Sequence, residues 1–366
     1  MNFRRALSTL AVTSLAALPF AALAPATASA TGSLDWSGSV GSTGPQTAPA
    51  FDVQAHRGGL GLYTESSLAA FANALEMGVT TLELDTQITE DGVAVVTHDR
   101  KVSNNKCLDT APATPGDPEY PYVGKYINTL TLEQIKTMDC GSLRVADHPE
   151  QQTVPGAKMQ TLTEVLDLVK SYNAPDVKMN IETKVEAGAP SETAPRDQFV
   201  RTVLGTIRDA GMLDRVTIQS FDWGSLMLTR ELEPSVPTVA LTNGDFLQIG
   251  KPGASPWLGG LDIDDFGGDA IAAISTFGAS AFSPVQGTPQ GGKVSDPNFE
   301  LYVTADMVDS AHARDIKVIP WTVNDPETMH ALMDLGVDGI ITDRPDRLRT
   351  VLTERGMELP APATKK

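Results

Sequence analysis

Short apolar stretches alternate with stretches of helical periodicity along most of this 366-residue chain. Apolar residues that recur every three to four positions predict helices. These segments are residues 66–77, 132–138, 162–169, 197–210, 305–314 and 327–335. Nine further apolar runs have the length and composition of strands. They are residues 51–55, 81–88, 93–97, 177–183, 216–220, 238–242, 279–282, 318–323 and 337–342.

Strand–helix alternation of this kind predicts an α/β fold with a parallel sheet. At this length a closed (β/α)₈ TIM-type barrel is favoured over an open doubly wound sheet. The sequence offers nine strand candidates, but the barrel has eight strands. We take residues 279–282 as the surplus strand. The sequence Thr-Glu-Asp-Gly at 89–92 predicts a hairpin turn between the second and third candidates. Residues 103–158, rich in proline and without periodicity, are interpreted as an irregular insertion between the third and fourth strands.

The N-terminal residues 1–30 have the pattern of a signal peptide. Arg4 and Arg5 precede an apolar run, and Ala28-Ser29-Ala30 supplies a small-residue cleavage site. Both the Sec route and the twin-arginine route remain open. We therefore expect a secreted, extracellular protein.

Composition divides the remaining chain into three parts. Residues 31–50 are rich in glycine, serine, threonine and proline, which predicts a flexible leader. Residues 51–353 carry the barrel pattern, and residues 354–366 form a C-terminal tail. No later apolar run is long enough to cross a bilayer, so stable membrane insertion is not expected.

Charge limits the class of partner. The formal net charge of −18 argues against nucleic acid or an anionic membrane surface as the main partner. It does not argue against a small phosphate ester, because salt screens distant charges over about 8 Å and local groups decide binding. The sequence does not indicate an oligomeric state.

The chain contains two cysteines, Cys107 and Cys140, both in the irregular segment. In an exported protein a disulfide between them is the simplest interpretation, with free buried thiols as the alternative. Two sulfurs without nearby histidines make a poor zinc site.

Charged side chains gather where predicted strands end, which is where barrel enzymes hold their reacting groups. His56 follows the first strand and His98 follows the third. Glu83 and Asp85 alternate with two leucines, so both carboxylates share one face of their strand, and Glu182 ends the fourth strand. Three converging carboxylates would repel one another without a cation. Their all-oxygen ligation suggests Ca²⁺, with Mg²⁺ possible.

Several short motifs occur in a fixed order along the chain. They are Ala-His-Arg-Gly (55–58), Glu65 at the start of the first helix, Glu-Leu-Asp (83–85), Val-Val-Thr-His-Asp (95–99), Asn-Ile-Glu-Thr-Lys (180–184), Gln-Ser-Phe-Asp (219–222), Trp-Thr-Val-Asn (321–324) and Gly-Val-Asp-Gly-Ile-Ile-Thr-Asp (336–343). Each motif is weak alone, but in this order the chain resembles the glycerophosphodiester phosphodiesterases from about residue 51 to residue 352.

The resemblance implies a role for each matching side chain. His56 and His98 match the acid/base histidines of that family. Its metal ligands correspond to Glu83, Asp85 and Glu182, and its basic groups near the phosphate correspond to Arg57 and Lys184. Glu65 and Trp321 match residues that line the substrate side. The implied reaction releases sn-glycerol 3-phosphate and an alcohol from a glycerophosphodiester or a fragment of a teichoic-acid-type polymer.

One departure from the family pattern is visible. The family usually has Glu-Asn-Thr where this chain has Glu65-Ser66-Ser67. We expect Ser66 to cap the helix that follows, and a hydrogen bond of the usual asparagine to be lost or rearranged.

Three interpretations of function remain open at this level. The first is the exported diester hydrolase, acting either through a cyclic phosphate or by direct attack of water. The second is a related barrel phospholipase of the phospholipase D-like type that acts on intact lipids, and the third is a catalytically silent binding protein of the same fold. We interpret His148, His312 and His330 as ordinary surface or packing residues, and the acidic run 262–269 as a solvated loop.

Overall fold

The computed structural model describes residues 50–366. The predicted signal peptide, and all but the last residue of the predicted leader, lie outside the described residues.

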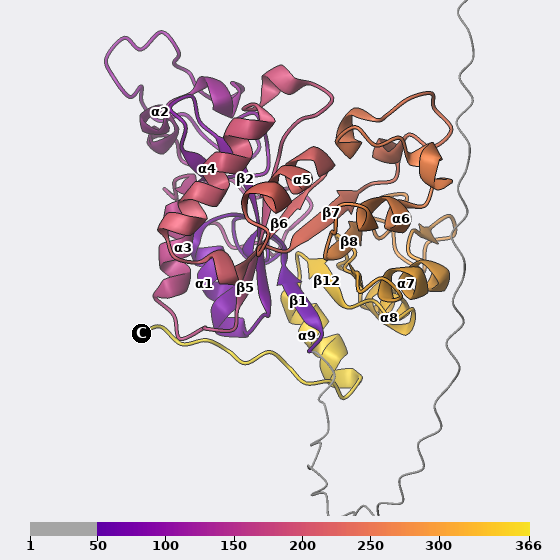
Figure 1. Ribbon diagram of the computed structural model, residues 1–366. Helices are drawn as coiled ribbons and strands as arrows, with labels where there is room; N and C mark the ends of the chain where they lie inside the picture. The colour runs from indigo at the N-terminus through magenta and orange to yellow at the C-terminus, as the bar shows by residue number, and fades with distance from the viewer. Residues whose placement is uncertain (1–49) are drawn as a thin grey trace, which may run out of the picture. The chain divides into compact units, whose positions relative to one another are not determined.

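Eight parallel strands form the centre of the described chain (Figure 1). In sheet order they are β11 (Lys317–Val318), β8 (Ala281–Pro284), β7 (Thr238–Thr242), β6 (Val216–Ser220), β5 (Lys178–Thr183), β2 (Thr81–Ile88), β1 (Asp52–Ala55) and β12 (Gly339–Thr342). The ends of this order meet, because the amide of Asp338 donates to the carbonyl of Val318 (2.9 Å) and the amide of Ile341 donates to that of Pro320 (3.0 Å). The predicted closed (β/α)₈ barrel is confirmed.

Helices surround the strands in Figure 1. They are α1 (Leu68–Met77), α3 (Leu162–Lys170), α4 (Arg196–Asp209), α5 (Trp223–Leu232), α6 (Ala270–Ser275), α7 (Ala305–His312), α8 (Pro326–Asp334) and α9 (Pro345–Glu354). A ninth helix, α2 (Leu132–Thr137), lies within the irregular segment. Within residues 50–366 no helix combines the length and the apolar character that a membrane span requires.

The assignment of the surplus strand was wrong. Residues 281–284 form β8, a full member of the barrel between β7 and β11. The extra strand is β3 (Ala94–Val96), which pairs antiparallel with β2. The predicted hairpin turn at 89–92 is the physical reason, because a tight hairpin reverses the chain and cannot deliver a parallel strand. The insertion therefore separates the second and third strands of the barrel, β2 and β5.

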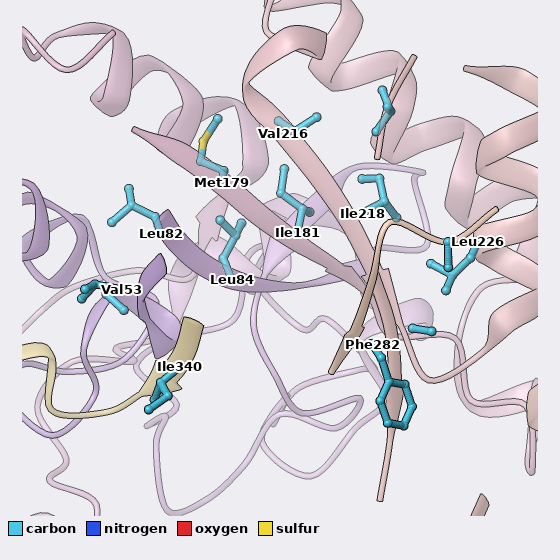
Figure 2. Packing of buried hydrophobic residues seen from close by; sticks show 14 of the residues in the cluster. Val53, Leu82, Leu84, Met179, Ile181, Val216, Ile218, Leu226, Phe282 and Ile340 are labelled. Carbon is cyan, nitrogen blue, oxygen red and sulfur yellow. The ribbon is translucent and has the colours of Figure 1, made fainter. Parts of the chain in front are cut away.

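Apolar side chains on the strands and helices form the main core. Figure 2 shows strand residues of this cluster, among them Leu82 and Leu84 of β2 and Ile181 of β5. These side chains pack with helix residues such as Phe71 of α1 and Phe199 of α4. Leu82 and Leu84 are fully buried in this cluster, so strand alternation directs Glu83 and Asp85 to the barrel interior.

The irregular segment has a small core of its own. Tyr122, Ile127 and Leu130 are fully buried within it. The expected disulfide joins Cys107 to Cys140, across 33 positions of sequence.

Replacing both cysteines with serine is expected to destabilise this segment. Opening a loop of 33 positions increases the entropy of the unfolded chain and costs about 3–4 kcal/mol in the chain-entropy model. Urea unfolding followed by tryptophan fluorescence and by protease cleavage within 103–158 measures the change. Equal protease resistance of the variant and the parent protein would show that the covalent link does not stabilise the segment.

The C-terminal tail packs back onto the barrel. The amide of Ala363 donates to the carbonyl of Leu75 at the end of α1 (2.8 Å). The amide of Asn173, just beyond α3, donates to the carbonyl of Thr364 (2.7 Å). These contacts lie at the ends of helices and leave the carboxyl ends of the strands open for the site.

Candidate active site

Three acidic side chains converge inside the barrel, two from β2 and one from the carboxyl end of β5. The strand register places Asp85 directly beside Glu182. Carboxylate oxygens of Glu83, Asp85 and Glu182 lie within 4.8 Å of one another, and all three residues are buried. The structure thus brings together the three acids that the sequence predicts as metal ligands.

The electrostatics of this cluster fit a cation. Burial, with the negative charge of Asp85, raises the pKa of Glu83 well above its usual range. Burial also raises the pKa of Glu182 to about 7, although Lys184 opposes the shift. The Oδ2 atom of Asp85 is buried, and its 3.1 Å contact with Arg57 Nε lacks hydrogen-bond geometry. A divalent ion would contact that oxygen and offset the burial and repulsion that raise the pKa of Glu83 and Glu182.

Two basic groups border the cluster. The backbone amide of Arg57 donates to Glu83 Oε2 (2.8 Å), and its side-chain Nε lies 3.1 Å from Asp85 Oδ2. The ammonium group of Lys184 lies 3.0 Å from Glu182 Oε1 and 3.5 Å from Asp85 Oδ1. Burial alone would lower the pKa of Lys184, but the charges of Glu182 and Asp85 outweigh it and the pKa is raised. Both side chains are charged and lie against the acidic cluster.

His56 lies on one side of the acidic cluster and is held by Asp343. Its Nδ1 lies 2.5 Å from Asp343 Oδ1, and its Nε2 lies 4.0 Å from Glu83 Oε2. Asp343 immediately follows β12 and is fixed in turn by the side-chain amide of Asn324 (2.6 Å). Burial alone would raise the pKa of Asp343. The contact with His56 outweighs burial, and the pKa of this carboxyl group is lowered. An ionised Asp343 therefore orients the imidazole with Nε2 free.

Replacing Asp343 with asparagine is expected to lower kcat about 10²-fold with a smaller change in KM. The amide can hold a neutral imidazole but does not stabilise its protonated form, which is the role of the aspartate in triads of this kind. Steady-state kinetics test this. An unchanged kcat would show that His56 does not depend on Asp343.

His98 follows β3 and has an equivalent carboxylate partner. Its Nδ1 lies 2.8 Å from Asp99 Oδ1. Lys106 bridges Asp99 and Glu65, with its ammonium group 2.8 Å from an oxygen of each. Burial, with the positive charges of Arg57 and then Lys184, lowers the pKa of His98 to about 4. In the absence of a metal His98 is thus neutral at pH 7 and can accept a proton.

One pocket of about 500 Å³ brings the acidic cluster, the two basic groups and the two imidazoles together. Both histidines, the three acids, Arg57 and Lys184 line it, together with Gln219, Trp321 and His148. Residues from the barrel strands and from the insertion therefore meet around a single cavity at the carboxyl ends of the strands.

Comparisons with known proteins agree on one family. The model of the glycerophosphoryl diester phosphodiesterase family matches residues 56–347. The chain belongs to this family. A glycerophosphodiester phosphodiesterase from Caldanaerobacter subterraneus is 27% identical over 304 residues, which cover 83% of this chain and 98% of that protein.

Solved structures of the family share the fold of this member. A putative glycerophosphoryl diester phosphodiesterase from Silicibacter pomeroyi has a TM-score of 0.69 and 28% identity, over 84% of this chain and 95% of that one. A phosphodiesterase from Oleispira antarctica, solved in complex with the product sn-glycerol-3-phosphate, has a TM-score of 0.58 and 18% identity over 82% and 96% of the two chains. The latter likeness supports the fold alone.

Two residues of this family member occupy places other than those expected. His148, interpreted as an ordinary surface or packing residue, lines the pocket, and its Nε2 lies 3.9 Å from Asp343 Oδ2. His148 lies in the irregular segment, which has no apolar period, so the sequence could not predict that this side chain reaches the pocket. Glu65 does not line the pocket and instead lies behind Arg57, 3.3 Å from its guanidinium. Glu65 therefore supports a basic residue of the pocket.

The departure at Ser66 has a backbone explanation. Ser67, not Ser66, caps α1 by accepting a hydrogen bond from the amide of Ala70. Ser66 has a φ of 58°, in the left-handed region. Asparagine tolerates that region better than most residues, so the backbone at this position suits the asparagine of the pattern noted above.

The remaining candidates lie elsewhere. His312 pairs with Asp338 and His330 pairs with Glu354 at the surface, and neither lines the pocket. In the acidic run 262–269, Asp262 and Asp269 cap short helical turns. Among the described residues, Glu83, Asp85 and Glu182 alone form a cluster suited to a metal.

Some residues of the site were not predicted from the sequence. Asp343, Asp99 and Lys106 each support a histidine or its partner, and Gln219 donates to Glu83 Oε1 (2.7 Å). A signal for Asp343 was present, since it follows the last predicted strand and therefore sits at the carboxyl face like His56.

Proposed function

We propose that this protein is a metal-dependent glycerophosphodiester phosphodiesterase that releases sn-glycerol 3-phosphate and an alcohol. One observation carries the proposal: a buried cluster of three carboxylates shares a pocket with two imidazoles, each bonded to its own carboxylate. Membership of the family, and the similarity to the glycerophosphodiester phosphodiesterase of Caldanaerobacter subterraneus, support the choice of substrate.

The metal would be held by Glu83, Asp85 and Glu182. We favour Ca²⁺ over Mg²⁺ because the ligands are all oxygens and several come from side chains. When bound, the cation supplies positive charge that polarises the phosphoryl group. Oxygen ligands of this kind do not suit zinc as well.

The other residues act on charge and protons. Arg57 and Lys184 offset the negative charge that develops on the phosphoryl oxygens. His56 and His98 keep Nε2 free because Nδ1 is bonded to a carboxylate in each case. One imidazole takes the proton of the attacking hydroxyl, and the other gives a proton to the departing alcohol. The attacking hydroxyl belongs either to the glycerol of the substrate, through a cyclic phosphate, or to water.

An assay of product formation tests the proposal. Purified protein is incubated with glycerophosphocholine, with intact phosphatidylcholine and with a polyglycerol phosphate fragment, each with Ca²⁺ or with a chelator. We expect sn-glycerol 3-phosphate from the soluble diesters only when Ca²⁺ is present. A cyclic product from intact lipid would favour the phospholipase, and no product from any diester would favour a binding protein. Phosphorus NMR during turnover reveals a cyclic phosphate if that route is used.

We also propose that the protein is exported. The support comes from the signal-peptide pattern at residues 1–30 and from the disulfide, since disulfides persist in oxidising compartments outside the cytoplasm. Mass spectrometry of the natively produced protein tests this. We expect a mature chain in the culture medium that begins after Ala30, and a full-length chain confined to cells would contradict the proposal.

A further inference from the structure

A second pocket of about 450 Å³ adjoins the first. The two pockets share His98, Glu182, Lys184 and Phe221. The cleft therefore continues past the acidic cluster instead of ending there. A phosphodiester carries two alcohol arms on one phosphate, and two pockets that share Lys184 and His98 can take one arm each.

A row of four aromatic rings joins the two pockets. The ring centroids of Trp321 and Phe221 lie 5.4 Å apart, those of Phe221 and Phe246 lie 5.5 Å apart, and those of Phe246 and Trp257 lie 4.0 Å apart. Trp321 lines the first pocket, Phe221 lines both, and the other two line the second. All four side chains are only half-buried. The second pocket thus has an apolar wall with accessible ring surface.

The charged groups of the second pocket are largely engaged with one another. The guanidinium of Arg100 bonds the carboxylates of Glu186 and Glu192. The ammonium group of Lys101 lies 4.4 Å from the ring centroid of Tyr126. The rings of Phe221, Phe246 and Trp257 therefore remain as accessible apolar surface beside these paired charges.

This wall favours one class of alcohol. A quaternary ammonium group presents methyl groups to ring faces and is attracted by their quadrupoles, most strongly by tryptophan. A polyol arm such as glycerol has no positive charge and gains no such attraction from the rings.

We infer that the second pocket receives the departing alcohol, and that Phe246 and Trp257 select alcohols with a quaternary ammonium group over polyols. The inference rests on the proposed diester hydrolysis and adds the leaving-group class to it. Trp321, in the first pocket, would contact the glycerol arm that all substrates share.

Kinetics with two substrates test the inference. For the parent protein we expect kcat/KM about 10-fold higher for glycerophosphocholine than for glycerophosphoglycerol. Trp257→Ala should remove most of this ratio, and Trp257→Phe should keep part of it. Trp321→Ala should lower both values to the same extent. Phe277→Leu, at a half-buried aromatic residue that lines neither pocket, serves as the control and should leave the ratio as it is.

Calorimetry separates failure of the inference from failure of the proposed function. Binding of both diesters to the Ca²⁺-loaded His98→Ala variant gives Kd values without turnover, and Trp257→Ala in that background should erase the preference. Equal Kd values for the two diesters, or a preference that survives Trp257→Ala, would overturn the inference even if hydrolysis is normal. Absence of hydrolysis by the parent protein, with the preference in Kd intact, would overturn the proposed function alone.

Discussion

Replacing either His56 or His98 with alanine is expected to lower kcat about 10³-fold, within the range that general acid–base catalysis contributes. Each imidazole lines the pocket of the acidic cluster and is bonded through Nδ1 to a carboxylate that orients it. Removing one leaves the proton of the nucleophile or of the departing alcohol without a carrier. Release of sn-glycerol 3-phosphate from glycerophosphocholine measures the effect.

His312→Ala is the matched control for these variants. This histidine is exposed and pairs with Asp338 outside the pocket, so its loss should leave kcat within about 2-fold, the scale of a surface substitution. Circular dichroism should show the same fold for all three variants. A His98→Ala variant with full activity would remove His98 from the proposed reaction.

Removing the metal is expected to abolish turnover and to destabilise the fold. Treatment with a chelator should lower kcat/KM about 10³-fold, and added Ca²⁺ should restore it. A cation present at 100 times its Kd stabilises the protein by about 2.7 kcal/mol, which raises the melting temperature. The binding should weaken as pH falls below about 7, because burial raises the pKa of Glu182 to about 7 and protons then compete for this ligand.

Substituting the three proposed metal ligands one at a time shows which of them bind the cation. Glu83→Gln, Asp85→Asn and Glu182→Gln should each weaken Ca²⁺ binding in calorimetry as well as lower kcat. Asp264→Asn, in the exposed acidic run 262–269, should leave the affinity as it is. Calcium dependence that is identical in Glu83→Gln and the parent protein would exclude Glu83 from the ligands.

The barrel and the acidic cluster could be predicted because both follow from local sequence patterns. Strand–helix alternation indicates a parallel barrel, and the period of two in β2 assigns Glu83 and Asp85 to the face opposite Leu82 and Leu84. Helices α5, α6 and α9 were not predicted. Each of these helices follows a strand or precedes one after only a few residues, so its apolar pattern is hard to separate from that of the strand. In addition, α5 and α9 have no side-chain cap at their N-termini.

The side chains that hold the two histidines in place come from residues that are far from them, or from one another, in the sequence. Asp343 lies 287 positions from His56, and Lys106 lies 41 positions from Glu65. Such pairs form only when the barrel closes or when the insertion folds over it. The insertion has no regular period, so the arrival of His148 in the pocket also depends on tertiary packing that no local pattern encodes.

A crystal structure with Ca²⁺ and sn-glycerol 3-phosphate would reveal the ligands of the cation and the neighbours of the phosphate. Anomalous scattering locates the cation, and the density of the phosphate shows its neighbours. We expect a cation bound by Glu83, Asp85 and Glu182, with the phosphate in contact with Arg57 and Lys184 and within reach of both imidazoles. A cation bound elsewhere, or a phosphate that meets only one of His56 and His98, would contradict this expectation.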